Sequence, residues 1–336
     1  MKTTNASPVI FGFDFQVNAA IVLMLENIKE LKRLRLEGAT EDIELTMENG
    51  KKIFAQAKSV VKASSDFSNV RKNLKKAIET LSKSDGKDVE KLILITNSVN
   101  PLNEETSKGL FYGPPTDIQY HDLPEDGKKI IDGITDNLGV IFGKDKFRIK
   151  FFRFETDNEA ERYKVVLQMI QDFICRIGVD KNVSASDLMG IWQNDIFHNG
   201  SKIDTTIQID KNGIIWPIIV LAIGHNAPRE FLEDYDPGLA DEISAKYSEL
   251  IDNSIERYEM VTHVLYDFNK CSVIYEGITI KERVQRFVES CWKDYIEIIG
   301  LHSLDEEIQE GISRIVLSKV IQQRYTIDAI RKGVSL

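Results

Sequence analysis

The chain has 336 residues, of which 42% are hydrophobic and 29% charged, and its formal net charge is −10 at pH 7. This length exceeds the usual size of one hydrophobic core, so we expect two domains. Three widely separated cysteines argue against both a disulfide framework and a zinc site. The sequence shows no secretory leader and no run of about 18 apolar residues, which predicts a cytoplasmic protein without a membrane span.

The charged residues are unevenly distributed along the chain. Residues 1–100 contain 16 lysines and arginines against 13 acidic residues, so the rest of the chain carries the whole acidic excess. The basic balance of the first part favours contact with nucleic acid, and the acidic remainder favours contacts with proteins.

The first part of the chain alternates between helical and extended patterns. Apolar residues recur at helical spacing in two segments, and shorter apolar or alternating runs predict strands. The expected helices are 10–33 and 67–83, and the expected strands are 34–37, 41–47, 52–59 and 92–96. This order predicts an α/β fold in which helices flank a mixed sheet.

The second part of the chain is expected to be mainly helical. Residues 97–127 contain several prolines and glycines and are expected to form a loop, before a strand at 147–154 and a helix at 157–178. Beyond residue 185 we expect helices at 239–268, 280–300 and 304–333, and a strand pair around 204–220. The predicted domains are therefore residues 1–180 and a helical domain at 181–336.

The segment 36–59 has the residues of a metal-dependent site for cutting phosphodiester bonds. Asp42 is the expected anionic metal ligand, Gln56 offers a carbonyl oxygen, and Lys58 is suited to orient the attacking water or stabilise charge on the phosphate. Mg²⁺ prefers such oxygen ligands and retains several waters, so few protein ligands are needed. Glu44 shares a strand face with Asp42 and is an accessory candidate.

This site depends on how the two strands of the hairpin pair. A two-residue turn at Asn49-Gly50 would place Gln56 opposite Ile43, with Asp42 on the wrong face. A three-residue turn, Glu48-Asn49-Gly50, would place Asp42 opposite Gln56, and Gly50 suits the left-handed position of such a turn. The nuclease hypothesis therefore predicts the three-residue turn or a bulge, whereas a hairpin with solvated charges predicts neither.

Basic residues mark two segments as candidate DNA contacts. Arg71, Lys72, Lys75 and Lys76 are expected on the outer side of the 67–83 helix, where they would contact phosphates or form an ordinary solvated face. The residues Arg148, Lys150 and Arg153 in the expected strand at 147–154 are a weaker candidate set.

Several motif pieces together resemble the PD-(D/E)xK nuclease superfamily. They are Gly12-Phe-Asp-Phe-Gln16, Leu36-Glu-Gly, Glu41-Asp-Ile-Glu-Leu and Phe54-Ala-Gln-Ala-Lys58, within about residues 8–96. The match is similar to the double-stranded DNA endonuclease domain of bacterial anti-phage effectors of the CBASS and Lamassu type, and to Mrr-type restriction enzymes.

The resemblance implies a restriction-endonuclease-like fold and a catalytic core of Asp42, Gln56 and Lys58. It adds Glu37 to Asp42 and Gln56 as a metal ligand, and Gln16 as an accessory residue, with Mg²⁺ or Mn²⁺ as cofactor. The family often has an acid in place of Gln56, so one fewer negative charge implies weaker metal binding.

The function expected from this resemblance is double-stranded DNA cleavage by an effector of an anti-phage defence system. We expect a homo-oligomer, controlled by association through residues 181–336 or by partner subunits such as an SMC-like ATPase. The alternative is a non-catalytic DNA-binding or scaffold subunit with a degenerate nuclease fold, which Gln56 keeps open.

Overall fold

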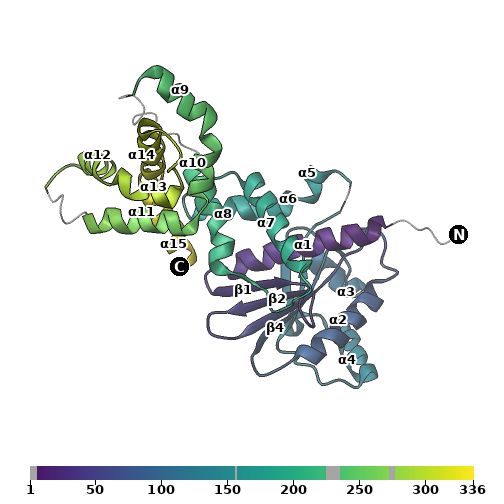
Figure 1. Ribbon diagram of the computed structural model, residues 1–336. Helices are drawn as coiled ribbons and strands as arrows, with labels where there is room; N and C mark the ends of the chain where they lie inside the picture. The colour runs from purple at the N-terminus through teal and green to yellow at the C-terminus, as the bar shows by residue number, and fades with distance from the viewer. Residues whose placement is uncertain (1–5, 156, 225–234, 272–276) are drawn as a thin grey trace. The chain divides into compact units, whose positions relative to one another are not determined.

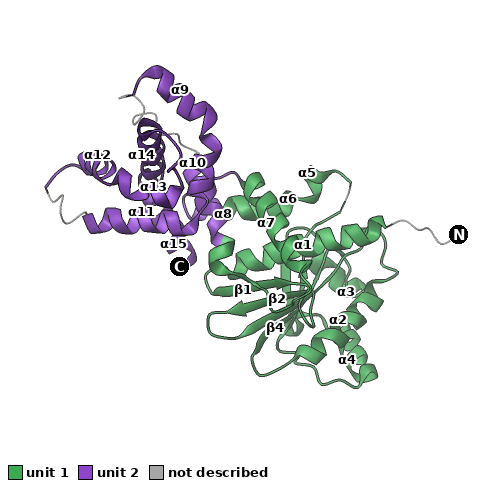
Figure 2. Cartoon of the chain, in the orientation of Figure 1, with its two compact units in different colours: residues 1–173, 185–214, 335 green, residues 174–184, 215–334, 336 purple. Residues whose placement is uncertain are grey.

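The computed structural model describes residues 6–155, 157–224, 235–271 and 277–336 (Figure 1). The chain divides into two compact units, coloured green and purple in Figure 2. Unit 1 comprises residues 1–173, 185–214 and 335, and unit 2 comprises residues 174–184, 215–334 and 336. Residue 180 therefore lies in a short segment of unit 2, after which the chain returns to unit 1.

Unit 1 is built on a mixed sheet, which confirms the α/β class. Within the described residues the sheet has seven strands in the order β5-β6-β4-β3-β2-β1-β7. The pairs β3–β4 and β4–β6 are parallel, and the other neighbouring pairs are antiparallel. The strands are β1 (Leu31–Leu36), β2 (Ile43–Met47), β3 (Lys52–Lys58), β4 (Val89–Thr96), β5 (Thr116–Gln119), β6 (Phe147–Phe151) and β7 (Ile209–Asp210).

Helices cover both faces of this sheet (Figure 1). The longer ones are α1 (Ser7–Asn27), α2 (Val70–Ser84), α4 (Glu125–Leu138), α6 (Lys164–Arg176) and α7 (Ala185–Gly200). The short ones are α3 (Glu105–Lys108) and α5 (Glu159–Arg162). Apolar residues of α2 recur every three or four positions and are buried with Phe54, Leu92 and Leu94 in one core cluster. The helices α1 and α7 contact each other and β1.

The hairpin of β2 and β3 has the register that the nuclease hypothesis requires. Ile43 pairs with Ala55 and Thr46 with Lys52, and the Met47 backbone nitrogen donates to the Lys51 oxygen at 2.9 Å. The turn therefore contains three residues, Glu48-Asn49-Gly50, and Gly50 has a left-handed φ of +81°. Continued by one residue, this register places Asp42 opposite Gln56.

Two segments of unit 1 differ from the sequence expectation. The first helix ends at Asn27 and not near residue 33, because Leu31 and Leu34 fit a helical stripe and an inward-facing strand equally well, and here they pair with β2. The expected loop at 97–127 contains α3, β5 and the start of α4. Polar residues that cap helix starts, such as Glu104, do signal these helices locally. The many prolines and glycines of the segment favoured a loop prediction instead.

A third difference concerns residues 204–220. Only Ile209–Asp210 forms a strand in this segment, and α8 (Lys211–Gly224) follows at once with Pro217 inside the helix. The run of β-branched residues there suits a buried helix as well as a strand, and length decides between them.

Helix α1 is long and apolar enough to cross a membrane, with a mean hydropathy of 1.7, although no membrane span was expected. In the structure 61% of its apolar window is buried inside the protein. A core helix of a folded domain has the same composition, so this helix is weak evidence for a span.

The described residues of unit 2 form helices joined by turns and contain no strand, as expected for the C-terminal part. Its helices pack around α14, in which ten of the eleven residues from 311 to 321 are buried. The bounds are α9 (Pro237–Lys246), α10 (Ser248–Ile255), α11 (Tyr258–Cys271), α12 (Ile280–Cys291), α13 (Ile296–Ile299), α14 (Glu306–Gln322) and α15 (Arg324–Val334).

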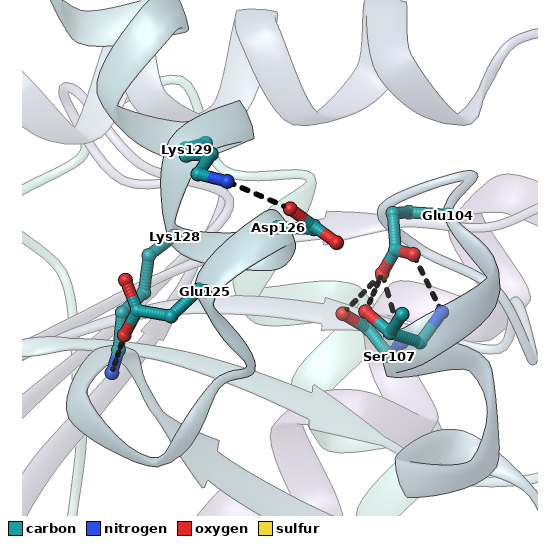
Figure 3. A network of polar contacts seen from close by, with 7 residues as sticks. Glu104, Ser107, Glu125, Asp126, Lys128 and Lys129 are labelled. Carbon is teal, nitrogen blue, oxygen red and sulfur yellow. Dashed lines mark hydrogen bonds and ion pairs between the residues drawn. The ribbon is translucent and has the colours of Figure 1, made fainter.

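A local polar network shows how the segment before α4 is fixed (Figure 3). The Glu104 carboxylate caps α3 by accepting hydrogen bonds from the backbone nitrogens of Thr106 at 2.5 Å and Ser107 at 2.8 Å. Nearby, Lys129 contacts Asp126 at 3.0 Å on the surface of α4. The cap orders this segment, whereas an exposed pair of this kind contributes little.

We expect Gly50→Ala to destabilise the protein by about 1–2 kcal/mol, because a side chain is disfavoured at a left-handed φ. Gly133→Ala is the matched control, since no atom lies within 4 Å of its added Cβ and alanine favours a helix interior by about 1 kcal/mol. Chemical unfolding of both variants would measure the two effects. A Gly50→Ala variant as stable as the wild type would contradict the strained turn.

Candidate functional site

The predicted site residues lie at the end of the sheet where β1 ends, β2 begins and β3 ends. The chain reverses tightly between β1 and β2, since Glu37 N donates to Asp42 O at 2.8 Å and Gly38 N to Glu41 O at 2.9 Å. Glu37 has a positive φ of 51°, which is uncommon for a residue other than glycine. Such strained positions are concentrated at functional sites.

The Asp42 carboxylate connects β2 to β3 and to the candidate lysine. Its Oδ2 atom accepts hydrogen bonds from the Ala57 backbone nitrogen at 2.9 Å and from Lys58 Nζ at 2.8 Å. The side chains are 15% and 22% exposed for Asp42 and Lys58, so the ion pair is only partly screened by water. The strand positions and the ion pair together fix the orientation of the Asp42 and Lys58 side chains at this end of the sheet.

Glu37 and Gln16 belong to the same cluster. Burial and then the negative charge of Asp42 raise the pKa of Glu37, while a hydrogen bond from Gln16 and the positive charge of Lys58 oppose this shift. Two acids close enough to raise a pKa are the arrangement that a bound cation would stabilise.

Gln56 faces a residue that the sequence analysis did not select. Its Nε2 atom donates to Glu41 Oε2 at 2.8 Å, and Ser84 Oγ donates to Glu41 Oε1 at 2.6 Å. Glu41 is 2% exposed and Gln56 is 4% exposed. The only sequence signal for Glu41 was its place beside Asp42, because its partner Ser84 lies 43 residues away.

Glu44, the other accessory candidate, lies beside the first turn of this site. A Cβ atom added to Gly38 would be only 2.0 Å from Glu44 Oε1, so the glycine makes room for this side chain. Its charge contributes to the raised pKa of Glu41, which puts it near the buried acid.

A buried arginine, Arg35, holds the backbone next to the candidate site in place. Arg35 is fully buried, and its guanidinium donates to the backbone oxygens of Asn199 at 2.6 Å, Lys202 at 2.8 Å and Ile207 at 3.0 Å. Its Nε atom also donates to the backbone oxygen of Glu37 at 3.2 Å. These bonds fix the end of β1 to the last turn of α7 and to the segment that follows it, which holds the Glu37 backbone in place.

The two candidate basic sets differ in their availability. Arg71, Lys72, Lys75 and Lys76 are all exposed on α2. Arg71 donates to the Asn103 backbone oxygen at 3.2 Å and also feels the negative charge of Glu104. The weaker set is paired with acids, since Arg148 contacts Asp117, Lys150 contacts Glu26 and Asp117, and Arg153 contacts Glu155. The α2 set therefore retains its charge for phosphate binding.

The donor set fits a hard cation only if amide oxygens take part. Across the residues that the structure describes, no three acidic, histidine or cysteine side chains are grouped as a metal site. The Gln16 Oε1 atom is, however, buried and has no hydrogen-bond partner. A buried acceptor without a donor, on a side chain that also bonds to the Glu37 carboxylate, has the chemistry of an oxygen ligand for Mg²⁺.

Comparison with known proteins adds no assignment. No family model, no curated protein and no solved structure matches this chain. The roles of these residues therefore rest on their chemistry and geometry, and on the resemblance of the motifs.

We expect Glu41 to make the protein less stable as the pH rises from 5 to 8. Burial raises the pKa of Glu41 from 4.5 to about 7, against the hydrogen bonds from Ser84 and Gln56. The folded chain therefore binds more protons than the unfolded chain between these values, and the free energy of unfolding falls with increasing pH. Glu41→Gln should remove this loss, on the order of 1–2 kcal/mol after solvent screening.

Thermal unfolding in EDTA at pH 5 and pH 8 would measure this slope without a metal. Glu104→Gln is the control, because hydrogen bonds to Thr106 lower the pKa of Glu104 to about 2 and it stays ionised over this range. Equal pH slopes for the wild type and Glu41→Gln would contradict the prediction.

Proposed function

We propose that this chain is a metal-dependent double-stranded DNA endonuclease, with unit 1 as a restriction-endonuclease-like catalytic domain. The observation that supports this most strongly is the register of β2 and β3. It brings Asp42 level with Gln56 and within 2.8 Å of Lys58, on an odd turn that a solvated hairpin does not need.

In this proposal each side chain has a defined task. Asp42, Glu37 and the Gln56 carbonyl oxygen hold Mg²⁺ or Mn²⁺, which when bound polarises the phosphate and activates water. Gln16 holds Glu37 in place. Lys58 orients the water or stabilises negative charge on the phosphate, because its ammonium is already held at the carboxylate edge of the site.

The exposed basic face of α2 is the proposed contact for the DNA backbone. In the described part of the chain no ion pair involves these exposed residues, Arg71, Lys72, Lys75 and Lys76, and the acid on the same helix, Glu79, pairs with Lys83. Contacts of this kind give affinity without base specificity.

Control by association is the proposed role of unit 2. A nuclease that is always active would damage its own cell, so its activity needs control. The acidic, helical residues of unit 2 are suited to bind other proteins, and we find no catalytic motif in their sequence. We include a homo-oligomer and partner subunits of an anti-phage system, such as an SMC-like ATPase, in this proposal. Sedimentation of the full chain tests self-association, and a monomer at all concentrations would contradict it.

A second candidate is a non-catalytic DNA-binding or scaffold subunit. Gln56 favours it, since one carboxylate fewer weakens metal binding. In that case the α2 face would bind DNA, but no variant at Asp42 or Lys58 would alter any activity.

We expect purified full-length protein to cut plasmid DNA with Mg²⁺ or Mn²⁺, and Lys58→Ala to cut at least about 100-fold more slowly. Lys52→Ala is the matched control, because it also removes a lysine from β3. This lysine pairs with Asp88 at 3.9 Å and is not part of the proposed site. Cleavage that survives Lys58→Ala would contradict the mechanism. DNA binding without cleavage by the wild type, alone and with its partners, would favour the second candidate.

We expect Lys75→Ala/Lys76→Ala to weaken DNA binding uniformly across sequences. Each lost phosphate contact should reduce the slope of log affinity against log salt by about 1, so the double variant should lose about 2. Fluorescence anisotropy with a DNA duplex at several salt concentrations would measure the slope. The control is Lys128→Ala/Lys129→Ala on α4, where both lysines pair with acids, and equal slopes for the two double variants would exclude the α2 face.

A further inference from the structure

Glu41 is a buried acid whose contacts lead directly to the candidate site. One oxygen accepts from Gln56 Nε2 at 2.8 Å and the other from Ser84 Oγ at 2.6 Å. Its backbone oxygen accepts from Gly38 N at 2.9 Å, which fixes the residue that precedes Asp42. The backbone and the carboxyl group of Glu41 are therefore both held in place. Of its partners, only Gln56 belongs to the proposed metal site.

The hydrogen bond to Glu41 determines which end of the Gln56 amide faces which way. Both oxygens of the Glu41 carboxyl group accept hydrogen bonds, one of them from Gln56 Nε2, so the amide presents its NH₂ group to this acid. The carbonyl oxygen of Gln56 then points away from Glu41. The register of β2 and β3, continued by one residue beyond Ile43 and Ala55, puts Asp42 opposite Gln56. We therefore assign the Gln56 oxygen to the side of the proposed ligands.

We propose that Glu41 is a positioning residue that acts through Gln56, and this inference rests on the proposed metal-dependent function. It holds the amide with its oxygen toward the site and polarises it, so that a neutral glutamine can serve as a metal ligand. Carboxylates behind metal-binding histidines act in the same way, by fixing orientation and raising the basicity of the ligand.

The alternative is that Glu41 only anchors the loop at 38–42 to α2 through Ser84. The two roles can be separated because, in the described part of the chain, Ser84 Oγ donates to Glu41 and Thr40 and makes no hydrogen bond with Gln56. An anchoring role requires the Ser84 bond, whereas a positioning role requires the Gln56 bond and a negative charge at residue 41 or 56.

The test is Mn²⁺ binding by the full chain, measured by electron paramagnetic resonance. A short phosphorothioate DNA duplex, which resists cleavage, is present throughout. We expect Glu41→Gln to weaken Mn²⁺ binding about tenfold. The exchange variant Glu41→Gln/Gln56→Glu should restore it, because the acid then contacts the ion and the amide supports it. Ser84→Ala should keep the wild-type affinity.

A folded Glu41→Gln protein that binds Mn²⁺ as tightly as the wild type would overturn the inference. So would an exchange variant no better than Glu41→Gln, or a loss as large in Ser84→Ala. A wild type that binds no Mn²⁺ would overturn the metal-dependent function itself, and with it this role of Glu41.

A second measurement uses neither metal nor a variant at Glu41. In metal-free protein labelled with ¹⁵N-glutamine, the Gln56 side-chain amide is identified by its absence in Gln56→Glu. We expect one of its protons to be shifted downfield by the bond to the Glu41 carboxylate. An unshifted pair of protons, as for a solvated glutamine, would overturn the inference even if Glu41→Gln fails to fold.

Discussion

The register between β2 and β3 is the constraint on which the candidate site depends. Side chains alternate along a strand, so a slip of one residue would turn Asp42 away from Gln56 and bury Glu44 in place of Leu45. The three-residue turn prevents this slip, and Gly50 permits the turn because it adopts a φ of +81° without steric cost. A single backbone conformation thus determines whether the acid, the amide and the lysine share one end of the sheet.

The support for this end comes from far along the chain. Arg35 is 164 residues from Asn199, yet its guanidinium bonds to the oxygens of Asn199, Lys202 and Ile207 and so closes the sheet beside β7. A buried cation is costly unless its donors are satisfied, and within the described residues the hydrogen bonds of Arg35 all go to backbone oxygens. This leaves the nearby acids, Glu37 and Asp42, free of a competing arginine bond.

Negative charge at the site is divided between two layers. Asp42 and Glu37 lie beside Lys58, while Glu41 is buried behind Gln56 and near Glu44. A third acid placed directly beside Asp42 and Glu37 would add repulsion. Because Glu41 bonds to the Gln56 amide, this acid lies close to the candidate site without direct contact with Asp42 or Glu37 among the described hydrogen bonds, which gives a physical reason for an amide at position 56.

The sequence by itself determined the α/β class, the helical C-terminal part, and the candidate set of Asp42, Gln56 and Lys58, because these depend on local periodicity and on side-chain chemistry. It also reduced the site to one question of turn length. It did not find the end of α1 at Asn27, helix α8, or the role of Glu41, since apolar runs fit both helix and strand and a contact with Ser84 has no local signal. Only the tertiary structure decided the register, the burial of Arg35 and the pairing of Glu41 with Gln56, because each joins residues that folding brings together from separate elements.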